Sequence, residues 1–315
     1  MPKDYVVVLG GMNLDLAGFP KGHYREKDSN IGEIEMHVGG VGHNIARNLT
    51  QLEVPTYLIS VFGDDYFGNI IYHEVKKSDI HLDHVEKIAG AKSSIYLYVT
   101  DDQGDMVTAI NDMRIVEAIT PEFLAKKIDF INNARLCVLD ANLSQESMEW
   151  LADHAQVPLL VDPVSVAKAE RLQNVLDQID TIKPNEHEIA CLTGIKVTGL
   201  ATAKQAAKKL NQRGVKNVFI SLGARGILCS RKEEQVLIPP IAKKIVSTNG
   251  AGDTTMAALV WTHYLYGEVL SLKEIGLLTQ SAAAINLGSA QAVSPQLNVK
   301  NIIQTAQTYQ DKMED

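Results

Sequence analysis

Short apolar runs recur along the chain at the intervals that strands and helices of an α/β protein require. The runs expected to form strands are Val6–Leu9, Tyr57–Val61, Leu136–Leu139, Leu159–Val161 and Val218–Ser221. Stretches with helical character lie between them, at His43–Leu52, Pro121–Asn133 and Ala201–Arg213. Strands that are apolar throughout and alternate with helices are typical of a parallel sheet covered on both faces. The pattern therefore predicts an α/β fold in which helices sandwich a mostly parallel sheet.

Residues 15–38 and 93–112 depart from this pattern and have the character of exposed β structure. Ser94–Val99 alternates along its length, a turn follows, and Met106–Ile110 returns as a second strand. A hairpin of this kind can serve as a lid, form a contact in an oligomer, or be an ordinary edge hairpin. Because no repeat, low-complexity tract or linker divides the sequence, we expect one domain over residues 1–315, with these two segments as a lid.

Polar residues follow several of the predicted strands at the end where the chain leaves the sheet. They are Asp140, Asn142, Asp162, Lys183, Asn185, Ser221 and Gly223. In open α/β sheets, ligands bind at the carboxyl ends of the strands. The sequence thus predicts a ligand site along this edge.

The segment Ser247–Asp253 carries two glycines and a carboxylate. It lies between a β-prone stretch, 236–246, and an apolar run, Met256–Trp261, that is typical of a buried helix. Glycine lets the main chain approach a ligand closely, and the start of a helix presents unpaired N–H groups. Together they form a cradle for an anion such as phosphate. Asp253 at its mouth is suited to take a proton from a hydroxyl, although a simple helix cap would have the same sequence context.

A second glycine cluster, Gly39 and Gly40, comes directly before a predicted helix and is followed by Asn44. Its spacing is not that of the dinucleotide fingerprint, and the sequence contains no P-loop. The glycines allow close backbone approach, and the Asn44 amide offers both a donor and an acceptor to sugar hydroxyls. Asp15, at the end of the first strand, adds a carboxylate that can accept hydroxyl protons. Asn44 could equally cap the helix, and Asp15 could be a solvated turn residue.

Asn185 and Glu188 open a predicted helix directly after a short strand at 181–182. One interpretation is a helix cap, with an amide at the start and acids in the first turn. The other is a site for Mg²⁺ and its waters, since Mg²⁺ takes few direct protein ligands. The sequence alone leaves both open.

The turn that follows the strand at 218–221 contains Ser221, Gly223 and Gly226. Its glycine spacing fits either a plain hairpin or a loop around a nucleotide. Lys168, after another strand, could meet a phosphate as a point charge or simply be solvated. These four residues are candidates for contact with a nucleotide.

Net charge narrows the class of binding partner, and cysteine usage indicates the cellular compartment. The net charge of −8 argues against a nucleic-acid backbone or an anionic membrane as the main partner. No signal-peptide pattern precedes the first strand, and no apolar run approaches the length of a membrane span. Cys137, Cys191 and Cys229 lie singly, as expected in a reducing compartment. We therefore expect a cytoplasmic protein with a small-molecule partner.

Taken in order along the chain, these motifs resemble those of the ribokinase-like sugar kinases of the phosphofructokinase-B family. The resemblance covers nearly the whole chain, and its most specific motif is Gly250–Asp253. It implies a Rossmann-like sandwich with a β lid that closes over a sugar and often joins two subunits, and it implies ATP as the phosphoryl donor. The implied roles are a base at Asp253, an anion hole at Gly250, Ala251 and Gly252, sugar contacts at Asp15, Gly39, Gly40 and Asn44, Mg²⁺ near Asn185 and Glu188, and nucleotide contacts at Ser221 and Gly223.

Within the family, the likeness is closest to bacterial pseudouridine kinases. The stretches that carry it are Asp28–Gly32, Gly39–Ala46, Ala109–Met113 and Val161–Ser165. The implied reaction transfers a phosphoryl group from ATP to the 5′-hydroxyl of pseudouridine. Alternatives are a kinase for ribose, another nucleoside or a keto-sugar acid, or a sugar sensor without catalysis. The lid residues expected to read the base are Ser29, Asn30, Tyr96, Asn111 and Asp112.

Ser247 and Asn249 depart from the family pattern, which usually has Asp and Thr at these positions. The acidic residue helps to form a monovalent-cation site in several relatives. A requirement for potassium is therefore left open. Mg²⁺ with ATP and a homodimer through the lid are expected.

Overall fold

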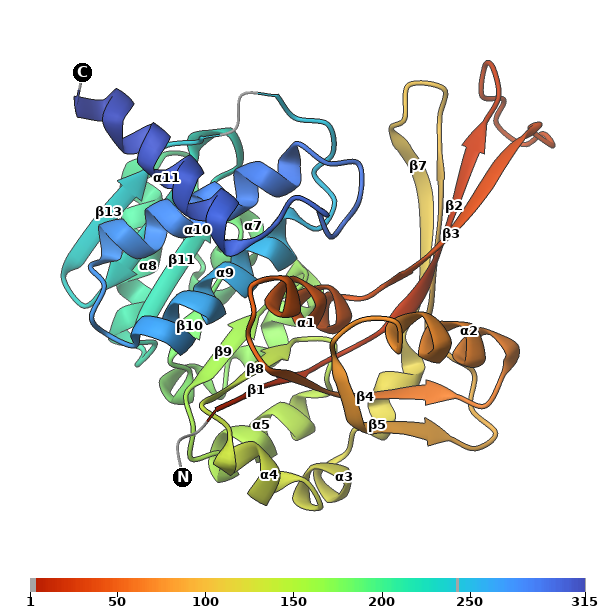
Figure 1. The fold of residues 1–315 in the computed structure, drawn as a ribbon, viewed down its shortest axis with the longest axis horizontal. Coiled ribbons are helices and arrows are strands. Elements are labelled where there is room, and N and C mark those ends of the chain that lie inside the picture. The colour runs from red at the N-terminus through yellow and green to blue at the C-terminus, as the bar shows by residue number, and fades with distance from the viewer. Residues whose placement is uncertain (1–3, 242–243, 315) are drawn as a thin grey trace.

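A nine-stranded sheet forms the centre of the computed structural model, which describes residues 4–241 and 244–314 (Figure 1). Its strands, in spatial order, are β13 (Glu234–Ile238), β12 (Ile227–Arg231), β11 (Asn217–Ser221), β10 (Thr181–Ile182), β9 (Leu159–Asp162), β8 (Leu136–Asp140), β1 (Val6–Leu9), β4 (Thr56–Gly63) and β5 (His81–Ile88). All neighbours from β11 to β5 pair in parallel, and β12 and β13 are antiparallel. The predicted, mostly parallel α/β sheet is confirmed.

The β-prone stretch at 236–246 is a strand only as far as Ile238. Pro239 and Pro240 follow, and proline cannot donate to a sheet ladder. Residues 242–243 of that stretch lie outside the described residues.

Helices cover both faces of the sheet. One face carries α1 (Val41–Gln51), α2 (Tyr66–Val75), α9 (Ala251–Tyr266), α10 (Leu272–Leu287) and α11 (Val299–Glu314). The other carries α3 (Pro121–Ala125), α4 (Ile128–Asn133), α5 (Gln145–His154), α6 (Val166–Ala169), α7 (Glu186–Thr193) and α8 (Leu200–Gln212). Short 3₁₀ turns lie at Arg114–Ala118, Glu170–Leu172, Leu176–Gln178 and Gly223–Arg225. Within the described ranges, no helix has the length and apolar character needed to cross a membrane.

The helix predicted at Pro121–Asn133 is broken in two at Lys126 and Lys127. The Lys127 side chain is buried, and its Nζ lies 2.6 Å from a carboxylate oxygen of Glu86 on β5. The break lets this lysine turn inward to an ion pair that the local pattern does not reveal.

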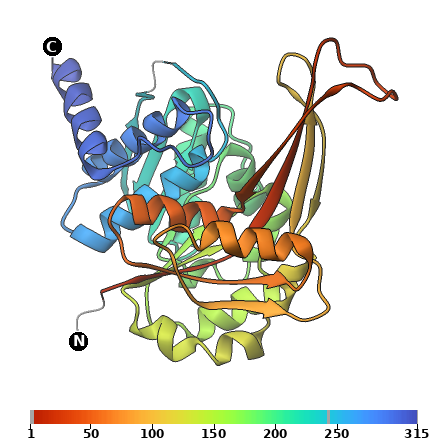
Figure 2. The ribbon, with the colours of Figure 1, turned by 45° about the vertical axis from the view of Figure 1, so that its right-hand side comes forward.

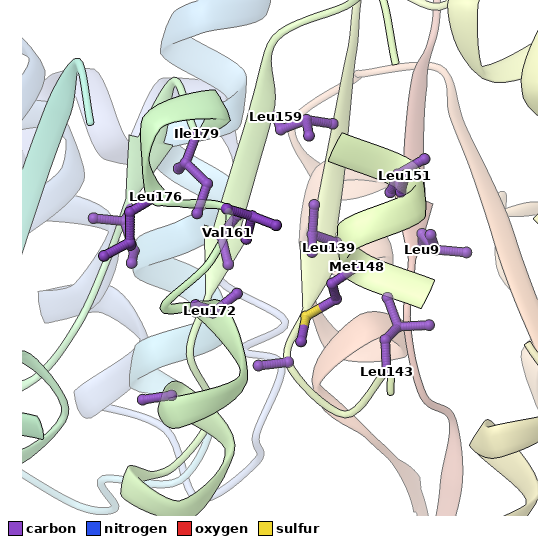
Figure 3. Packing of buried hydrophobic residues seen from close by; sticks show 14 of the residues in the cluster. Leu9, Leu139, Leu143, Met148, Leu151, Leu159, Val161, Leu172, Leu176 and Ile179 are labelled. Atoms are coloured by element: carbon purple, nitrogen blue, oxygen red, sulfur yellow. The ribbon is translucent and has the colours of Figure 1, made fainter. Parts of the chain in front are cut away.

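The central strands alternate their side chains between two hydrophobic clusters. In β1, Val6 and Val8 belong to the cluster beneath α1 and α9, whereas Val7 and Leu9 belong to the opposite cluster. Figure 3 shows part of the second cluster, where side chains of β8, β9 and α5 pack together. This two-sided burial holds the strand ends, and the polar residues that follow them, in a fixed arrangement.

A separate four-stranded sheet extends away from this body (Figure 2). Its strands, in spatial order, are β3 (Gly32–Gly39), β2 (Asn13–Pro20), β6 (Ile95–Thr100) and β7 (Met106–Asp112). They correspond to the two segments expected to form exposed β structure, and the predicted hairpin at 94–110 is β6 and β7.

The two faces of the four-stranded sheet differ in polarity, because side chains alternate along each strand. One row across the sheet consists of His37, Asp15, Tyr96 and Asn111. The adjacent row, on the opposite face, consists of Met36, Leu16, Leu97 and Ile110. The sheet thus has a polar face that contains Asp15 and an apolar face whose outer residues are exposed.

Candidate active site

Asp253 lies in the first turn of α9, directly behind a glycine turn. Gly250 is the N-cap residue, with φ of 72°, and a Cβ there would overlap the carbonyl group of Ala292. Only glycine fits this left-handed, tightly packed position. The first-turn N–H groups of Gly252 and Asp253 have no acceptor within their own helix. Since Gly250 occupies the cap position, Asp253 is not the helix cap that the sequence left as an alternative.

Asn44 of α1 meets Asp253 across a sequence separation of 209 residues. Its Nδ2 donates a hydrogen bond of 2.8 Å to Oδ2 of Asp253. The cap position of α1 is held by Gly40, with φ of 101°, where a Cβ would lie 2.6 Å from the carbonyl oxygen of Gly11. Asn44 is therefore free of a capping role, and the two glycine motifs converge on one carboxylate.

The surroundings of Asp253 make it a much weaker acid than an ordinary aspartate. Asp253 is only partly exposed, and its carboxyl group is hydrogen-bonded to the Asn44 side chain. Burial raises its pKa most, and the negative charge of Asp162 raises it further. The Asn44 hydrogen bond and the Lys183 ammonium oppose this, and the pKa is raised to about 7. A carboxyl group with this pKa can exchange a proton near neutral pH.

A buried ion pair lies beside Asp253 at the carboxyl ends of β9 and β10. Nζ of Lys183 is 3.2 Å from Oδ2 of Asp162, and both side chains are about 6% exposed. Burial lowers the pKa of the Lys183 ammonium, but the charges of Asp162, Glu188 and Asp253 outweigh it and raise the pKa overall. Gly252 is also close, since a Cβ there would lie 3.5 Å from Nζ of Lys183. In the sequence, Lys183 is marked only as a polar residue at the end of a strand, and that position is the signal for its place in the site.

Asp140, at the end of β8, joins three backbone segments. Its Oδ2 accepts hydrogen bonds of 2.9 Å from the N–H groups of Gly11 and Gly42, and its Oδ1 accepts one of 3.0 Å from Asn142. It therefore anchors the ends of β1 and β8 to the start of α1. This contact holds α1, and with it Asn44, against the sheet edge.

Asp15 and Asn44 line one cleft of about 650 Å³ between the four-stranded sheet and the body. Asn13 donates a hydrogen bond to Oδ1 of Asp15, and a Cβ on Gly39 would overlap the same carboxylate. Burial raises the pKa of Asp15 to about 6, against the opposing effects of Asn13 and His37. The structure thus brings together the residues expected to contact a sugar.

The residues expected to read a base are spread over the four-stranded sheet and the loop between β2 and β3. Tyr96 and Asn111 share the polar face with Asp15. Asp112 points to the opposite face, and its Oδ2 is 2.7 Å from Nη2 of Arg114.

Ser29 and Asn30 lie in the exposed loop between β2 and β3, at the far end of the strands from Asp15. The Asn30 side chain bonds to the backbone of this loop, at both the N–H and the carbonyl group of Arg25. The structure therefore does not bring these two residues to Asp15.

Asn185 and Glu188 form a capping box at the start of α7. The Asn185 side chain accepts hydrogen bonds of 2.9 Å from the N–H groups of His187 and Glu188. In return, the Glu188 carboxylate accepts from the N–H and the Nδ2 of Asn185, at 2.9 and 2.8 Å. The capping interpretation is confirmed. A backbone bridge also pairs Asn185 with Ser221 at the end of β11.

The turn after β11 needs glycine at two places. Gly223 has φ of 56° and Gly226 has φ of 93°, both in the left-handed region. The Nζ of Lys168 donates to Oδ1 of Asn142, near Asp140. The structure thus joins Asn185, Ser221 and the glycine turn, whereas the hydrogen bond of Lys168 is to Asn142.

Ser247 and Asn249 hold the loop that leads into Gly250. The N–H of Asn249 donates to Oγ of Ser247 at 3.1 Å, and its carbonyl group accepts from Nδ2 of Asn286 on α10 at 2.9 Å. Local and cross-helix hydrogen bonds therefore fix the approach to the glycine turn.

The charges along this edge of the sheet suit a cation that is bound through water and phosphate oxygens rather than directly by side chains. No three His, Cys, Asp or Glu side chains in the described part of the chain form a ready metal cage. The charged groups that interact here include the acids Asp140, Asp162, Glu188 and Asp253 and the bases Lys168, Arg171 and Lys183. The excess of acids fits Mg²⁺ bound mainly through waters and phosphate oxygens. Glu188 would act through water, because Asn185 engages both of its carboxylate oxygens.

Comparison with known proteins agrees with this geometry. The model of the pfkB family carbohydrate kinases matches residues 3–298. The chain is 35% identical to a pseudouridine kinase of Escherichia coli over 96% of both chains. It is 33% identical to the uncharacterized sugar kinase YeiI of the same organism, over 96% of this chain and 83% of that protein.

Solved structures share the fold over nearly the full length. A putative sugar kinase from Clostridium perfringens superposes with a TM-score of 0.84 at 29% identity, over 98% of this chain and 97% of that one. The ribokinase of Arabidopsis thaliana in complex with ribose and ATP superposes with a TM-score of 0.81 at 22% identity, over 96% and 98% of the two chains. This chain therefore belongs to the pfkB family of carbohydrate kinases, and it is a phosphotransferase that uses an alcohol group as acceptor.

Proposed function

We propose that the protein phosphorylates the 5′-hydroxyl of pseudouridine with ATP and releases pseudouridine 5′-phosphate and ADP. The observation that carries the proposal is the Asp253 carboxyl group, held by the Asn44 amide at 2.8 Å behind the Gly250 turn. The 35% identity to a pseudouridine kinase favours this nucleoside. The 33% identity to a sugar kinase of unassigned substrate keeps a related sugar or nucleoside as the second candidate.

In this mechanism Asp253 takes the proton of the attacking hydroxyl. Its raised pKa, about 7, matches the operating pH of a general base. The amides of Gly250, Ala251 and Gly252 are assigned to the anion hole for the transferring phosphoryl group. The Ala251 N–H donates to the carbonyl oxygen of Thr248 at 3.3 Å and would have to leave it to take part. Mg²⁺, when bound with ATP, would neutralise charge on the phosphates. Lys183 supports the site by balancing Asp162 and Asp253.

The sugar is proposed to lie in the cleft between Asp15 and Asn44, against the backbone of Gly39 and Gly40. The four-stranded sheet acts as the lid of a single domain and excludes water as it closes. Tyr96 and Asn111 are well placed to read the base, since they share the row of Asp15. Asp112 would have to leave Arg114 to take part, and Ser29 and Asn30 would reach the base only through lid closure.

The nucleotide is proposed to lie along the neighbouring strand ends. The residues assigned to it are Asn185, Ser221, Gly223, Gly226 and Lys168. The bridge between Asn185 and Ser221 supports a common surface for the first four. The contact of Lys168 with Asn142 favours a phosphate nearer the centre of the edge.

A substrate panel tests the proposed acceptor. ADP release would be measured with Mg²⁺ and ATP against pseudouridine, uridine, ribose and deoxyribose. We expect kcat/KM for pseudouridine to exceed the others by about tenfold or more, which corresponds to about 1.4 kcal/mol of discrimination. Phosphorus NMR of the product should show a 5′-phosphate. A preference for ribose or uridine would reject pseudouridine as the substrate, and no turnover of any alcohol would reject the wider proposal.

We propose further that the protein forms a homodimer through the apolar face of the lid. Ile34 is 80% exposed and Ile110 is 64% exposed, and Met36 and Leu97 lie on the same face. A contiguous apolar face of this kind is typical of a protein interface. A second copy of the chain would cover it.

Placing a charge on this face is expected to separate the subunits. Ile110→Lys should convert a species of twice the 34.5 kDa chain mass into a monomer, as measured by light scattering after size exclusion. Ala109→Lys is the matched control, because residue 109 lies on the same strand but on the opposite face. A wild-type protein that runs as a monomer at micromolar concentration would refute the dimer.

We also propose a cytoplasmic location. Cys137, Cys191 and Cys229 are all free thiols, as is usual in a reducing compartment.

A further inference from the structure

Three side chains form a line that ends on Asp253. Nδ1 of His43 lies 3.3 Å from Oδ1 of Asn44, and Nδ2 of Asn44 donates at 2.8 Å to Oδ2 of Asp253. We propose that His43 is a positioning residue that fixes the orientation of the Asn44 amide and, through it, the Asp253 base. The inference rests on the proposed role of Asp253.

The donors and acceptors in this line allow one arrangement when Asp253 is charged. A carboxylate can only accept, so the NH₂ group of Asn44 must face it. The amide oxygen then faces His43 and requires a donor there. Nδ1 of His43 therefore carries the proton, and the ring is in its Nδ1–H form.

The place of His43 in the fold suits this fixed role. The residue is 1% exposed, and its backbone N–H donates to the carbonyl oxygen of Gly11 at 3.2 Å. Burial lowers the pKa of its ring to about 4, and the charge of Arg47 adds to that effect. The ring thus stays neutral while Asp253 titrates, and it can hold its single Nδ1 proton.

Loss of the His43 donor would free the amide to rotate. With its oxygen toward the carboxylate, Asn44 would repel the charged form of Asp253 instead of stabilising it. The pKa of Asp253 would then rise further above its ordinary value. The effect is a change in the pH dependence of catalysis, which a loss of packing alone does not produce.

Two replacements of His43 distinguish the effect of losing the hydrogen-bond donor from the effect of losing the ring's volume. His43→Leu removes the donor, whereas His43→Asn places an amide NH₂ close to the position of Nδ1. The pH dependence of kcat/KM would be measured for both and for the wild type, with thermal melts to verify folding. The fall of kcat/KM at low pH, called the acid limb here, reports the protonation of Asp253. In His43→Leu we expect this limb to move up by about one pH unit, which is a tenfold change in the proton affinity of Asp253. It should stay in place in His43→Asn.

The outcomes separate this inference from the proposed function. An acid limb that does not move in His43→Leu, or that moves equally in both variants, overturns the role of His43. If the wild type has no acid limb near pH 7, or Asp253→Asn retains that limb, the base assignment itself fails. If His43→Leu is not folded at the assay temperature, His43→Met provides an apolar replacement with more freedom to pack. The charged groups that act on Asp253, namely Asp162, Lys183 and Asp140, are unchanged in all of these variants.

Discussion

Asp253→Asn is expected to lower kcat by about 10²–10⁴, the range typical for loss of a positioned general base. Asparagine has nearly the same shape and retains an oxygen that can accept from Asn44, so the fold should survive. The KM for ATP should change little, because the amides around Gly250 remain. Steady-state ADP release at saturating ATP and acceptor would measure both constants. Turnover at the wild-type level would remove Asp253 from the base role.

The pH profile gives an independent check on the same residue. Below its pKa of about 7, the Asp253 carboxyl group is protonated and cannot accept a proton from the acceptor hydroxyl. The wild-type kcat/KM should therefore fall about tenfold per pH unit below this value and level off above it. Asp15, whose pKa is raised to about 6, would make the fall of kcat/KM steeper below pH 6. In Asp253→Asn the limb near 7 should be absent.

The fold follows from the sequence because the central strands carry a strong local signal. Buried on both faces, they are continuous apolar runs, and each predicted run from Val6–Leu9 to Val218–Ser221 lies in a strand. The sequence predicts one helix over Pro121–Asn133, whereas the structure divides it into α3 and α4. Its break depends on an ion pair between Lys127 and Glu86, 41 residues away, which no local pattern contains.

The sequence also indicates the chemistry of the site, but it does not indicate which of the site residues contact one another. Glycines beside a carboxylate identify an anion cradle, yet helix caps have the same local context. The backbone separates the two cases, since Gly250 caps α9 and leaves Asp253 inside it, whereas Asn185 does cap α7. The bond from Asn44 to Asp253 spans 209 residues and depends on how α1 and α9 pack. Lys183 lacked a motif of its own, and only the sheet order brings it beside Asp162.

Lys183→Met tests whether that lysine balances the buried acids of the site. Methionine matches the length of the stem but removes the charge, which leaves Asp162 about 6% exposed with its partner gone. Breaking a buried pair in this way costs about 3–5 kcal/mol. We expect the free energy of unfolding to fall by this amount and Tm to fall on the order of 10 °C. Denaturant unfolding and calorimetry would measure the two quantities.

Lys127→Met is the matched control for this loss. Its Nζ is also buried and 2.6 Å from a carboxylate, but that partner, Glu86, is 46% exposed and can be hydrated when the lysine is removed. The control should therefore lose much less, near the value of about 1 kcal/mol for a solvated pair. Adding Asp162→Asn to Lys183→Met should recover part of the stability, because it removes the unpaired charge. If both lysine variants lose the same stability, or the second change recovers none, Lys183 does not hold the acids of this edge in balance.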